Sequence, residues 1–462
     1  MEIDEDDGQR ILSQFKSETG ELLCTPFDLQ LDLTVDKLQL LCNALLKKDE
    51  VVPYLFHIDD VEITDNLGSA LADLKLKNKE EFNSEKVLEI TYQPQAVFRV
   101  CAVTRCTSSL PGHAEAVISA SFTSGSGDTT VRFWDTMTQT PQFTCKGHKH
   151  WVLCIAWSPD GKKLASACKN GQICIWNPQS GKQMGKTLIG HRQWITFLSW
   201  EPLHRNSECR RLVSSSKDTT LKIWDIVLGQ AQFTLGGHTQ SVTCVRWGGS
   251  GLIYSGSQDR TIKVWRSEDG ALCRTLQGHA HWVNTLTLNT DYAIRTCCEG
   301  IIHYYLCNFN VKYKNLELLI CEMLISGSDD FTMYLWQPEN DRKPITRMTG
   351  HQQVINDVKF SPDMRLIASA SFDKSVKIWD GKTGKYIASL RGHVQAVYNV
   401  SWSADSRLLV SGSADSTLKV WDIKTKKLNV DLPGHADEVY AVDWSPDGTK
   451  VVSGGKDKVL KL

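Results

Sequence analysis

Short hydrophobic runs that end near an aromatic residue recur along the chain from about residue 96 to its end. Val152–Trp157 and Val439–Trp444 are two of these runs, and each is followed by a Ser-Pro-Asp-Gly turn. In most copies a strand of small residues, an Asp and an alternating strand ending in Trp come next, in that order. Runs of this length between turn-forming residues are typical of β-strands. The pattern therefore predicts a large all-β domain.

A Gly-His pair precedes each copy of the pattern and occurs eight times, mostly in steps of about 42 residues, which is the period of WD40 repeats. Six copies place an Asp six residues before a Trp, and in the second copy Asn170 stands in place of that Asp. This pattern resembles the WD40 family and predicts an eight-bladed β-propeller, because one blade cannot bury both of its faces alone. The pairs are Gly112-His113, Gly147-His148, Gly190-His191, Gly237-His238, Gly278-His279, Gly350-His351, Gly392-His393 and Gly434-His435.

The repeated polar residues indicate a structural network. In WD40 repeats, the His, a strand Ser or Thr, the Asp and the Trp form a hydrogen-bonded chain, which is strong in a low-dielectric interior when every member has a partner. A His near an Asp also suggests catalysis, but an active site would appear once, so we interpret the repeated pairs as structural. The network residues are predicted to be His148, His191, Asp218, His238, Asp259, His351, Asp373, His393, Asp415, His435 and Asp457.

The ring of blades must also close. The strand before each Gly-His pair is expected to be the outer strand of the preceding blade, but the strand at Ala96–Arg105 has no preceding blade. We predict that this strand completes the last blade, so that both ends of the propeller share one sheet. The propeller would then occupy residues 96–462.

Three stretches depart from the repeat. The first copy has 15 residues between its His and its Asp, against 22 in the sixth, so a turn and part of a strand are missing. The step from His279 to His351 is 72 residues and includes an atypical apolar and aromatic segment at 297–320. We interpret this segment as an insertion between blades or, as we favour, an error in the gene model. The chain also stops at Leu462, one residue before the Trp expected after Asp457.

A small α+β domain is predicted at residues 9–95, behind an acidic tail at 1–8. Thr34 suits a helix N-cap, and apolar residues follow it at helical spacing, namely Val35, Leu38, Leu41, Leu45 and Leu46. A hairpin, a helix and further strands in this order resemble a ubiquitin-like fold. The strands are expected at Arg10–Lys16, Leu22–Leu31, Pro53–Ile58 and Val87–Tyr92.

Both predicted domains carry stretches that resemble the Notchless family. These stretches are Tyr92–Val100 with Val103–Arg105 after it, Ile63–Leu67, and Gly434–Trp444. The resemblance covers nearly the whole chain and fails at the 297–320 segment and in the short first repeat. It implies a ubiquitin-like N-terminal domain, the NLE domain, in front of an eight-bladed propeller.

The resemblance also implies a function. Notchless proteins act in the nucleus and nucleolus as non-enzymatic assembly factors of the large (60S) ribosomal subunit, and they have a link to Notch signalling. Their partner midasin is a giant AAA-type ATPase whose metal-ion-dependent adhesion site holds Mg²⁺ with an open coordination position. A Glu of the ubiquitin-like domain fills that position while the propeller stays on the pre-60S particle. Counting back seven residues from Tyr92 assigns this role to Glu85.

The implied metal belongs to the partner. Mg²⁺ commonly uses one or two protein carboxylates, and one carboxylate does not hold the ion, so no intrinsic cofactor or metal site is expected in this chain. The implied partners are midasin, the pre-60S particle with its proteins and rRNA, and the intracellular region of Notch. The chain is expected to be monomeric outside such complexes.

Composition and motifs argue against some other classes of function and leave one alternative open. The net charge of −1 gives no reason to expect that the whole molecule is drawn to nucleic acid or membrane. An acidic start without an apolar run lacks the features of a signal peptide, and no Cys pair with zinc-ligand spacing has a matching second pair beside it, so reduced thiols are expected. A signalling scaffold or a ubiquitin-ligase substrate receptor stays as the alternative, although the sequence has no F-box-like segment. No phosphate-binding loop or nucleophile elbow supports an enzyme.

Three tryptophans follow Gly-His pairs by three positions. They are Trp151, Trp194 and Trp282, and they are equally compatible with partner binding and with packing. The sequence alone does not choose between these interpretations.

Overall fold

The computed structural model describes residues 10–17, 22–23, 25–46, 54–58, 61–63, 66–68, 71, 87–94, 103, 105–135, 138–291, 322–445 and 448–462. The chain divides into two compact units on either side of residue 100, close to the boundary expected at 95. In the described part, no helix is long and apolar enough to cross a membrane. Glu85 and the 297–320 segment lie outside the described residues.

The N-terminal unit is a mixed sheet with one helix. Its strands are ordered β2-β1-β5-β3-β4, with β1 and β5 parallel and the other pairs antiparallel. A hairpin, a helix and a parallel pair of first and last strands form the ubiquitin-like arrangement expected from the sequence. The elements are β1 (Arg10–Ser17), β2 (Phe27–Gln30), α1 (Val35–Leu46), β3 (Tyr54–Ile58), β4 (Val61–Glu62) and β5 (Leu88–Pro94).

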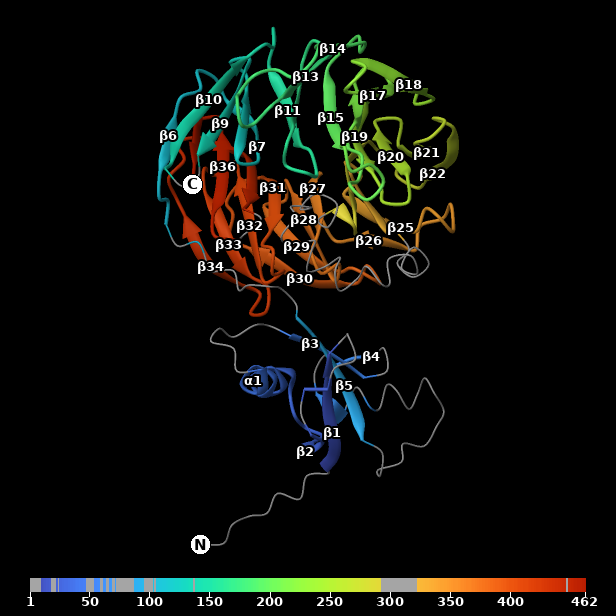
Figure 1. Cartoon of the computed structure of the whole chain (residues 1–462), viewed down its shortest axis with the longest axis vertical. Helices are drawn as coiled ribbons and strands as arrows, with labels where there is room; N and C mark the ends of the chain where they lie inside the picture. Colours follow the sequence, from blue (N-terminus) through green and yellow to red (C-terminus); the bar gives the residue numbers. More distant parts are fainter. Residues whose placement is uncertain are drawn as a thin grey trace, which may run out of the picture. The chain divides into compact units, whose positions relative to one another are not determined.

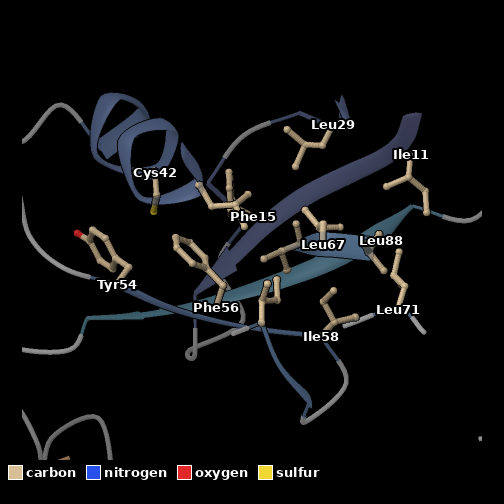
Figure 2. Packing of buried hydrophobic residues seen from close by; sticks show 13 residues of the cluster. Ile11, Phe15, Leu29, Cys42, Tyr54, Phe56, Ile58, Leu67, Leu71 and Leu88 are labelled. Atoms are coloured by element: carbon tan, nitrogen blue, oxygen red, sulfur yellow. The ribbon is translucent and has the colours of Figure 1, made fainter. Parts of the chain in front are cut away.

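One helix face and one sheet face form the core of this unit, as Figure 2 shows. The rings of Phe15 and Phe56 lie 5.8 Å apart between their centroids, and both side chains are fully buried. From α1 the fully buried apolar side chains are Leu38 and Cys42, which lie one helical turn apart. The sequence prediction also placed Leu41 and Leu45 on this face, but both are exposed, because the apolar stripe runs through Leu38 and Cys42.

The second unit contains eight four-stranded antiparallel sheets within the described residues, arranged as blades (Figure 1). Blade one is β7 (Val117–Ala120), β8 (Thr123–Ser126), β9 (Thr130–Asp135) and β10 (Thr140–Lys146). Blade two is β11 (Val152–Trp157), β12 (Leu164–Cys168), β13 (Gln172–Trp176) and β14 (Leu188–Ile189). Blade three is β15 (Ile195–Trp200), β16 (Arg211–Ser216), β17 (Thr220–Asp225) and β18 (Gln230–Gly236). Blade four is β19 (Val242–Trp247), β20 (Leu252–Ser257), β21 (Thr261–Arg266) and β22 (Leu272–Gln277).

The remaining blades follow in chain order. Blade five is β23 (Val283–Leu288), β24 (Leu324–Ser328), β25 (Thr332–Trp336) and β26 (Thr346–Thr349). Blade six is β27 (Ile355–Phe360), β28 (Leu366–Ser371), β29 (Ser375–Asp380) and β30 (Tyr386–Arg391). Blade seven is β31 (Val397–Trp402), β32 (Leu408–Ser413), β33 (Leu418–Asp422) and β34 (Lys427–Leu432). Blade eight is β35 (Val439–Trp444), β36 (Val451–Gly455), β37 (Val459–Lys461) and β6 (Ser109–Pro111).

The blades form a closed ring. The first strand of each blade contacts the first strand of the next, and β35 of blade eight contacts β7 of blade one. Hydrophobic clusters fill the spaces between neighbouring blades, as where Leu110, Val117 and Leu460 pack together. Stacking of this kind gives each blade the second buried face that it lacks alone.

The strand that closes the ring is β6, which pairs with β37 next to the C-terminus (Figure 1). The sequence prediction placed the closing strand at Ala96–Arg105, which is too early, although residues 95–102 and 104 lie outside the described ones. An outer strand such as β10 ends directly before its Gly-His pair, and β6 likewise ends directly before Gly112. Leu110, the middle residue of β6, is buried between blades eight and one.

The two repeats that depart from the regular pattern also form blades. Strands β7 and β8 have four residues each and turn tightly through Phe122, whose φ of 55° is left-handed, so the short first repeat forms a complete blade. The long step after His279 falls between β23 and β24, which pair in one sheet. The segment at 297–320 is therefore not an insertion between blades, as one interpretation held, but lies in the sequence between two strands of blade five.

Candidate functional site

Blade six shows the repeated polar network in full. His351 precedes β27, Ser369 lies on β28, and Asp373 lies in the turn to β29, which ends near Trp379. The Nε1–H group of Trp379 donates to Oγ of Ser369 at 2.9 Å, and Ser369 Oγ lies 2.7 Å from Nε2 of His351. Nδ1 of His351 lies 2.7 Å from Oδ2 of Asp373. The network thus joins both loops at one end of the blade to its second and third strands.

The ionisation state of Asp373 determines which atoms of the network donate hydrogen bonds and which accept them. Burial opposes ionisation of Asp373, but hydrogen bonds from His351 and Ser375 outweigh it and hold the pKa of Asp373 well below its usual range. An ionised carboxylate only accepts hydrogen bonds, so the His351 proton is on Nδ1 and Nε2 accepts from the hydroxyl of Ser369. Burial lowers the pKa of His351, although Asp373 opposes the shift, so the ring is neutral at neutral pH.

Six further blades place a His against an Asp and a Ser in the same way, with distances of 2.7 to 2.9 Å from Nδ1 to the Asp. This repetition favours a structural role over a catalytic one. The sets are His113, Asp128 and Ser124; His191, Asp218 and Ser214; His238, Asp259 and Ser255; His279, Asp330 and Ser326; His393, Asp415 and Ser411; and His435, Asp457 and Ser453.

Blade two is different. His148 lies 2.5 Å from Oγ of Ser166, but Asn170 accepts a hydrogen bond from the Cys168 thiol, and the group near Nδ1 of His148 is the thiol of Cys174 at 3.9 Å. Without a carboxylate to oppose it, burial lowers the pKa of His148 to about 4. This blade keeps the histidine and the serine of the network but lacks its anion.

The glycine of each Gly-His pair has a packing role. A Cβ atom at Gly147 would lie 2.9 Å from Cη2 of Trp176, and one at Gly190 would lie 3.0 Å from Cη2 of Trp224. The tryptophan at the end of the third strand therefore packs directly on the backbone before the histidine. At these two positions close approach of the indole ring requires a residue without a Cβ atom.

Sequence reasoning missed a second layer of the network. In the six blades other than two and eight, a Ser two residues before the Asp and a Thr or Ser two residues after it also bond to the Asp. In blade six, Ser371 Oγ accepts from Asp373 N–H at 3.2 Å, and Ser375 Oγ donates to Oδ1 at 2.6 Å. Blade two has Cys168 and Gln172 at these two positions. The Ser-x-Asp-x-Thr/Ser pattern was visible in the sequence and could have identified these residues.

Blade two offers a gain-of-stability prediction. The triple change Cys168→Ser, Asn170→Asp and Gln172→Thr is expected to raise the free energy of unfolding by about 1 kcal/mol, because it supplies a hydrogen-bonded acceptor for Nδ1 of His148. Denaturant unfolding measures the change, and Cys168→Ser alone is the matched control. A loss of stability in the triple variant would contradict this account of the network.

The buried histidines predict acid sensitivity. The folded-state pKa of His148 is about 4, and burial also lowers the pKa of His393 and His435, although their Asp partners oppose the shift. A histidine in the unfolded chain has a pKa of about 6.5, so the unfolded chain binds more protons below that pH. We expect the free energy of unfolding to fall steadily as the pH is lowered from about 6.5 towards 4. Denaturant titrations across this window test the prediction, and constant stability would contradict it.

The residue predicted to reach a partner-held metal, Glu85, lies outside the described residues. It precedes β5 by three positions in the sequence. Within the described residues, no cluster of three or more His, Cys, Asp or Glu side chains is arranged to hold a metal ion. The assignment of Glu85 therefore stays a prediction.

The three tryptophans after the Gly-His pairs lie on the surface. Trp151, Trp194 and Trp282 are 46%, 42% and 42% exposed, so packing inside the ring does not account for them. Lys169 and Lys217 lie over two of these rings, a pairing that the sequence prediction did not include. The sequence feature that could have indicated this pairing is a Lys directly before the network Asn or Asp.

Comparison with known proteins is consistent with both domains. The family model of the NLE (NUC135) domain matches residues 11–71, and that of the WD domain, G-beta repeat, matches residues 104–135, 139–177, 182–225, 229–266, 342–380, 384–422 and 426–462. The interval between the fourth and fifth WD matches, residues 267–341, contains the first three strands of blade five, in which the long segment separates β23 from β24. A crystal structure of the computationally designed Ika8 protein is similar with a TM-score of 0.62 and 27% identity, covering 77% of this chain and 98% of that chain.

Three relatives are about half identical to this chain over most of their own length. Protein Notchless of Drosophila melanogaster is 55% identical over 375 residues, covering 77% of this chain and 75% of that protein. The Notchless protein homolog of Arabidopsis thaliana is 53% identical over 398 residues, covering 83% of each. Ribosome assembly protein 4 of Saccharomyces cerevisiae is 49% identical over 378 residues, covering 74% of this chain and 72% of that protein. With an NLE domain, WD40 repeats and this degree of identity, the chain belongs to the Notchless family.

Proposed function

We propose that this chain is a non-catalytic assembly factor of the large (60S) ribosomal subunit, acting in the nucleus and nucleolus. The observation that carries the proposal is its similarity to ribosome assembly protein 4 of yeast over most of both chains. The structure supports a binding role, since the His–Asp pairs that could suggest catalysis are each committed to a network that holds a blade together.

The two domains suit two different attachments. We infer that the propeller binds the pre-60S particle, because a ring of eight blades offers a broad rigid surface on which loops can meet protein or RNA. The N-terminal domain would meet the ATPase midasin through Glu85, whose carboxylate would complete the coordination of a Mg²⁺ ion held by that partner. ATP-driven pulling on the N-terminal domain would then act on the particle through the propeller.

Depletion of the protein from growing cells tests the proposed function. The expected result is a fall in free large subunits relative to small subunits, with accumulation of large-subunit precursors in sedimentation profiles. Restoring the full chain should reverse both effects. An unchanged ratio of subunits after depletion would contradict the proposal.

A further inference from the structure

Two exposed tryptophans and two lysines form a row on one face of the propeller. In blade three His191 contacts Asp218, and in blade two the turn residue Lys169 donates its N–H to the loop residue Trp151, so in both blades the loop before the first strand and the turn before the third strand lie at the same end. In blades two and three these loops carry Trp151 and Trp194, and these turns carry Lys169 and Lys217. We call these four residues the Trp–Lys row.

The row is ordered by contacts of its own. The Nζ atom of Lys169 lies 4.6 Å from the ring centroid of Trp151 and 4.2 Å from that of Trp194, so it lies between the two indoles. Nζ of Lys217 lies 4.7 Å from the Trp194 ring. The backbone fixes this alternation, since Lys169 N–H donates to Trp151 O at 2.9 Å and Lys217 N–H donates to Trp194 O at 2.8 Å.

Charge on this face is unevenly distributed. The same loops of blades two and three also carry exposed Lys149 and Arg192, and the one acid among them, Asp218, is bonded to His191 and only 8% exposed. The equivalent loops of blades eight and one carry the acids Asp437, Glu438 and Glu115. The face is therefore basic and aromatic at blades two and three, although the net charge of the chain is close to zero.

We propose that the Trp–Lys row binds a single-stranded segment of RNA, with the lysines on phosphates and the indole rings stacked on bases. The inference rests on the proposed function, in which the propeller meets a particle rich in RNA, and it names the surface that would do so. Alternating aromatic rings and cations are the combination that holds single strands without sequence preference. An acidic peptide would use the lysines and leave both indole rings without a partner, and a duplex does not offer unstacked bases.

Binding of the full-length protein to a fluorescein-labelled, unstructured RNA of mixed sequence, followed by fluorescence anisotropy, tests this inference. The double variant Trp151→Ala/Trp194→Ala is expected to bind at least about tenfold more weakly, because base–aromatic stacking is removed. The double variant Lys169→Gln/Lys217→Gln should also bind more weakly. Its plot of log affinity against log salt should become shallower by about 0.7 for each phosphate that the protein no longer neutralises.

Two variants serve as matched controls. Trp282→Ala removes an equally exposed ring at the same loop position in blade five, beside His281 rather than a lysine. Lys456→Gln removes the lysine at the equivalent turn position in blade eight, where it lies 3.4 Å from Asp437. Both are expected to bind RNA as the wild type does. Thermal unfolding should be unchanged in all variants, since exposed side chains contribute little to the core.

Wild-type affinity in the Trp151→Ala/Trp194→Ala variant would overturn the inference. Stronger competition by a polyglutamate peptide or by duplex RNA than by the unlabelled single strand would overturn it as well. Sedimentation of the wild-type protein from cell extracts separates this failure from failure of the proposed function. Absence from large-subunit precursor fractions would refute the proposed function, whereas presence there without RNA binding by the purified protein would refute only the role of the row.

Discussion

Replacing Asp373 by alanine is expected to lower the free energy of unfolding by about 1–3 kcal/mol. Its carboxylate accepts from His351 at 2.7 Å, from the N–H group of Gln352 at 3.1 Å and from the hydroxyl of Ser375 at 2.6 Å. Its side chain is only 9% exposed, so water cannot readily replace these bonds. Denaturant unfolding of the full chain measures the decrease.

Two further variants make this test specific. Asp373→Asn should be less destabilising than alanine, because an amide oxygen can still accept a hydrogen bond, but it lacks the charge. Asp269→Ala removes a surface carboxylate that is 48% exposed and paired with Arg266, and a change of about 0–1 kcal/mol is expected. Equal stability of Asp373→Ala and the wild type would reject the structural network.

Replacing Glu85 by alanine is expected to abolish binding to the adhesion domain of midasin, because a methyl group cannot complete the coordination of Mg²⁺. Glu85→Asp should weaken binding, since the side chain is shorter by one methylene group. Removal of Mg²⁺ with EDTA should have the same effect as the alanine variant. A pull-down of the full chain with the adhesion domain, with and without Mg²⁺, measures all three.

The neighbouring Glu80 and Glu81 provide the matched controls. Alanine at either position should leave binding intact, and every variant should still associate with pre-60S particles if the propeller makes that attachment. Cells that carry Glu85→Ala should then retain the factor on stalled particles and show a dominant growth defect. Full binding by Glu85→Ala, or binding independent of Mg²⁺, would reject the assignment.

The architecture could be predicted because its determinants repeat. Most blades carry a His, a Ser, an Asp and a Trp, and in six of them the Trp follows the Asp by six residues, so the repeat is evident in the sequence. The helix of the N-terminal domain was located correctly, but its buried face was not. Leu41 and Leu45 follow the same spacing as the core residues, and only packing against the sheet shows that Leu38 and Cys42 are the residues that are buried.

Closure of the ring and the Trp–Lys row depend on neighbours that are distant in sequence. Strand β6 has three residues, too few to show a hydrophobic pattern, and its pairing with β37 joins residues about 350 positions apart. Lys169 lies between Trp151 of its own blade and Trp194 of the next, which no pattern within one repeat can indicate. The sequence could identify the tryptophans as candidate partner-binding residues, but it could not show which side chains surround them.

Affinity purification of the tagged full chain from growing cells tests the central claim most directly. The account predicts that pre-60S proteins and midasin are recovered together, and that midasin alone disappears from the purified material when Glu85 is replaced by alanine. Recovery of ubiquitin-ligase subunits or membrane-receptor signalling proteins, without large-subunit precursors, would contradict the account.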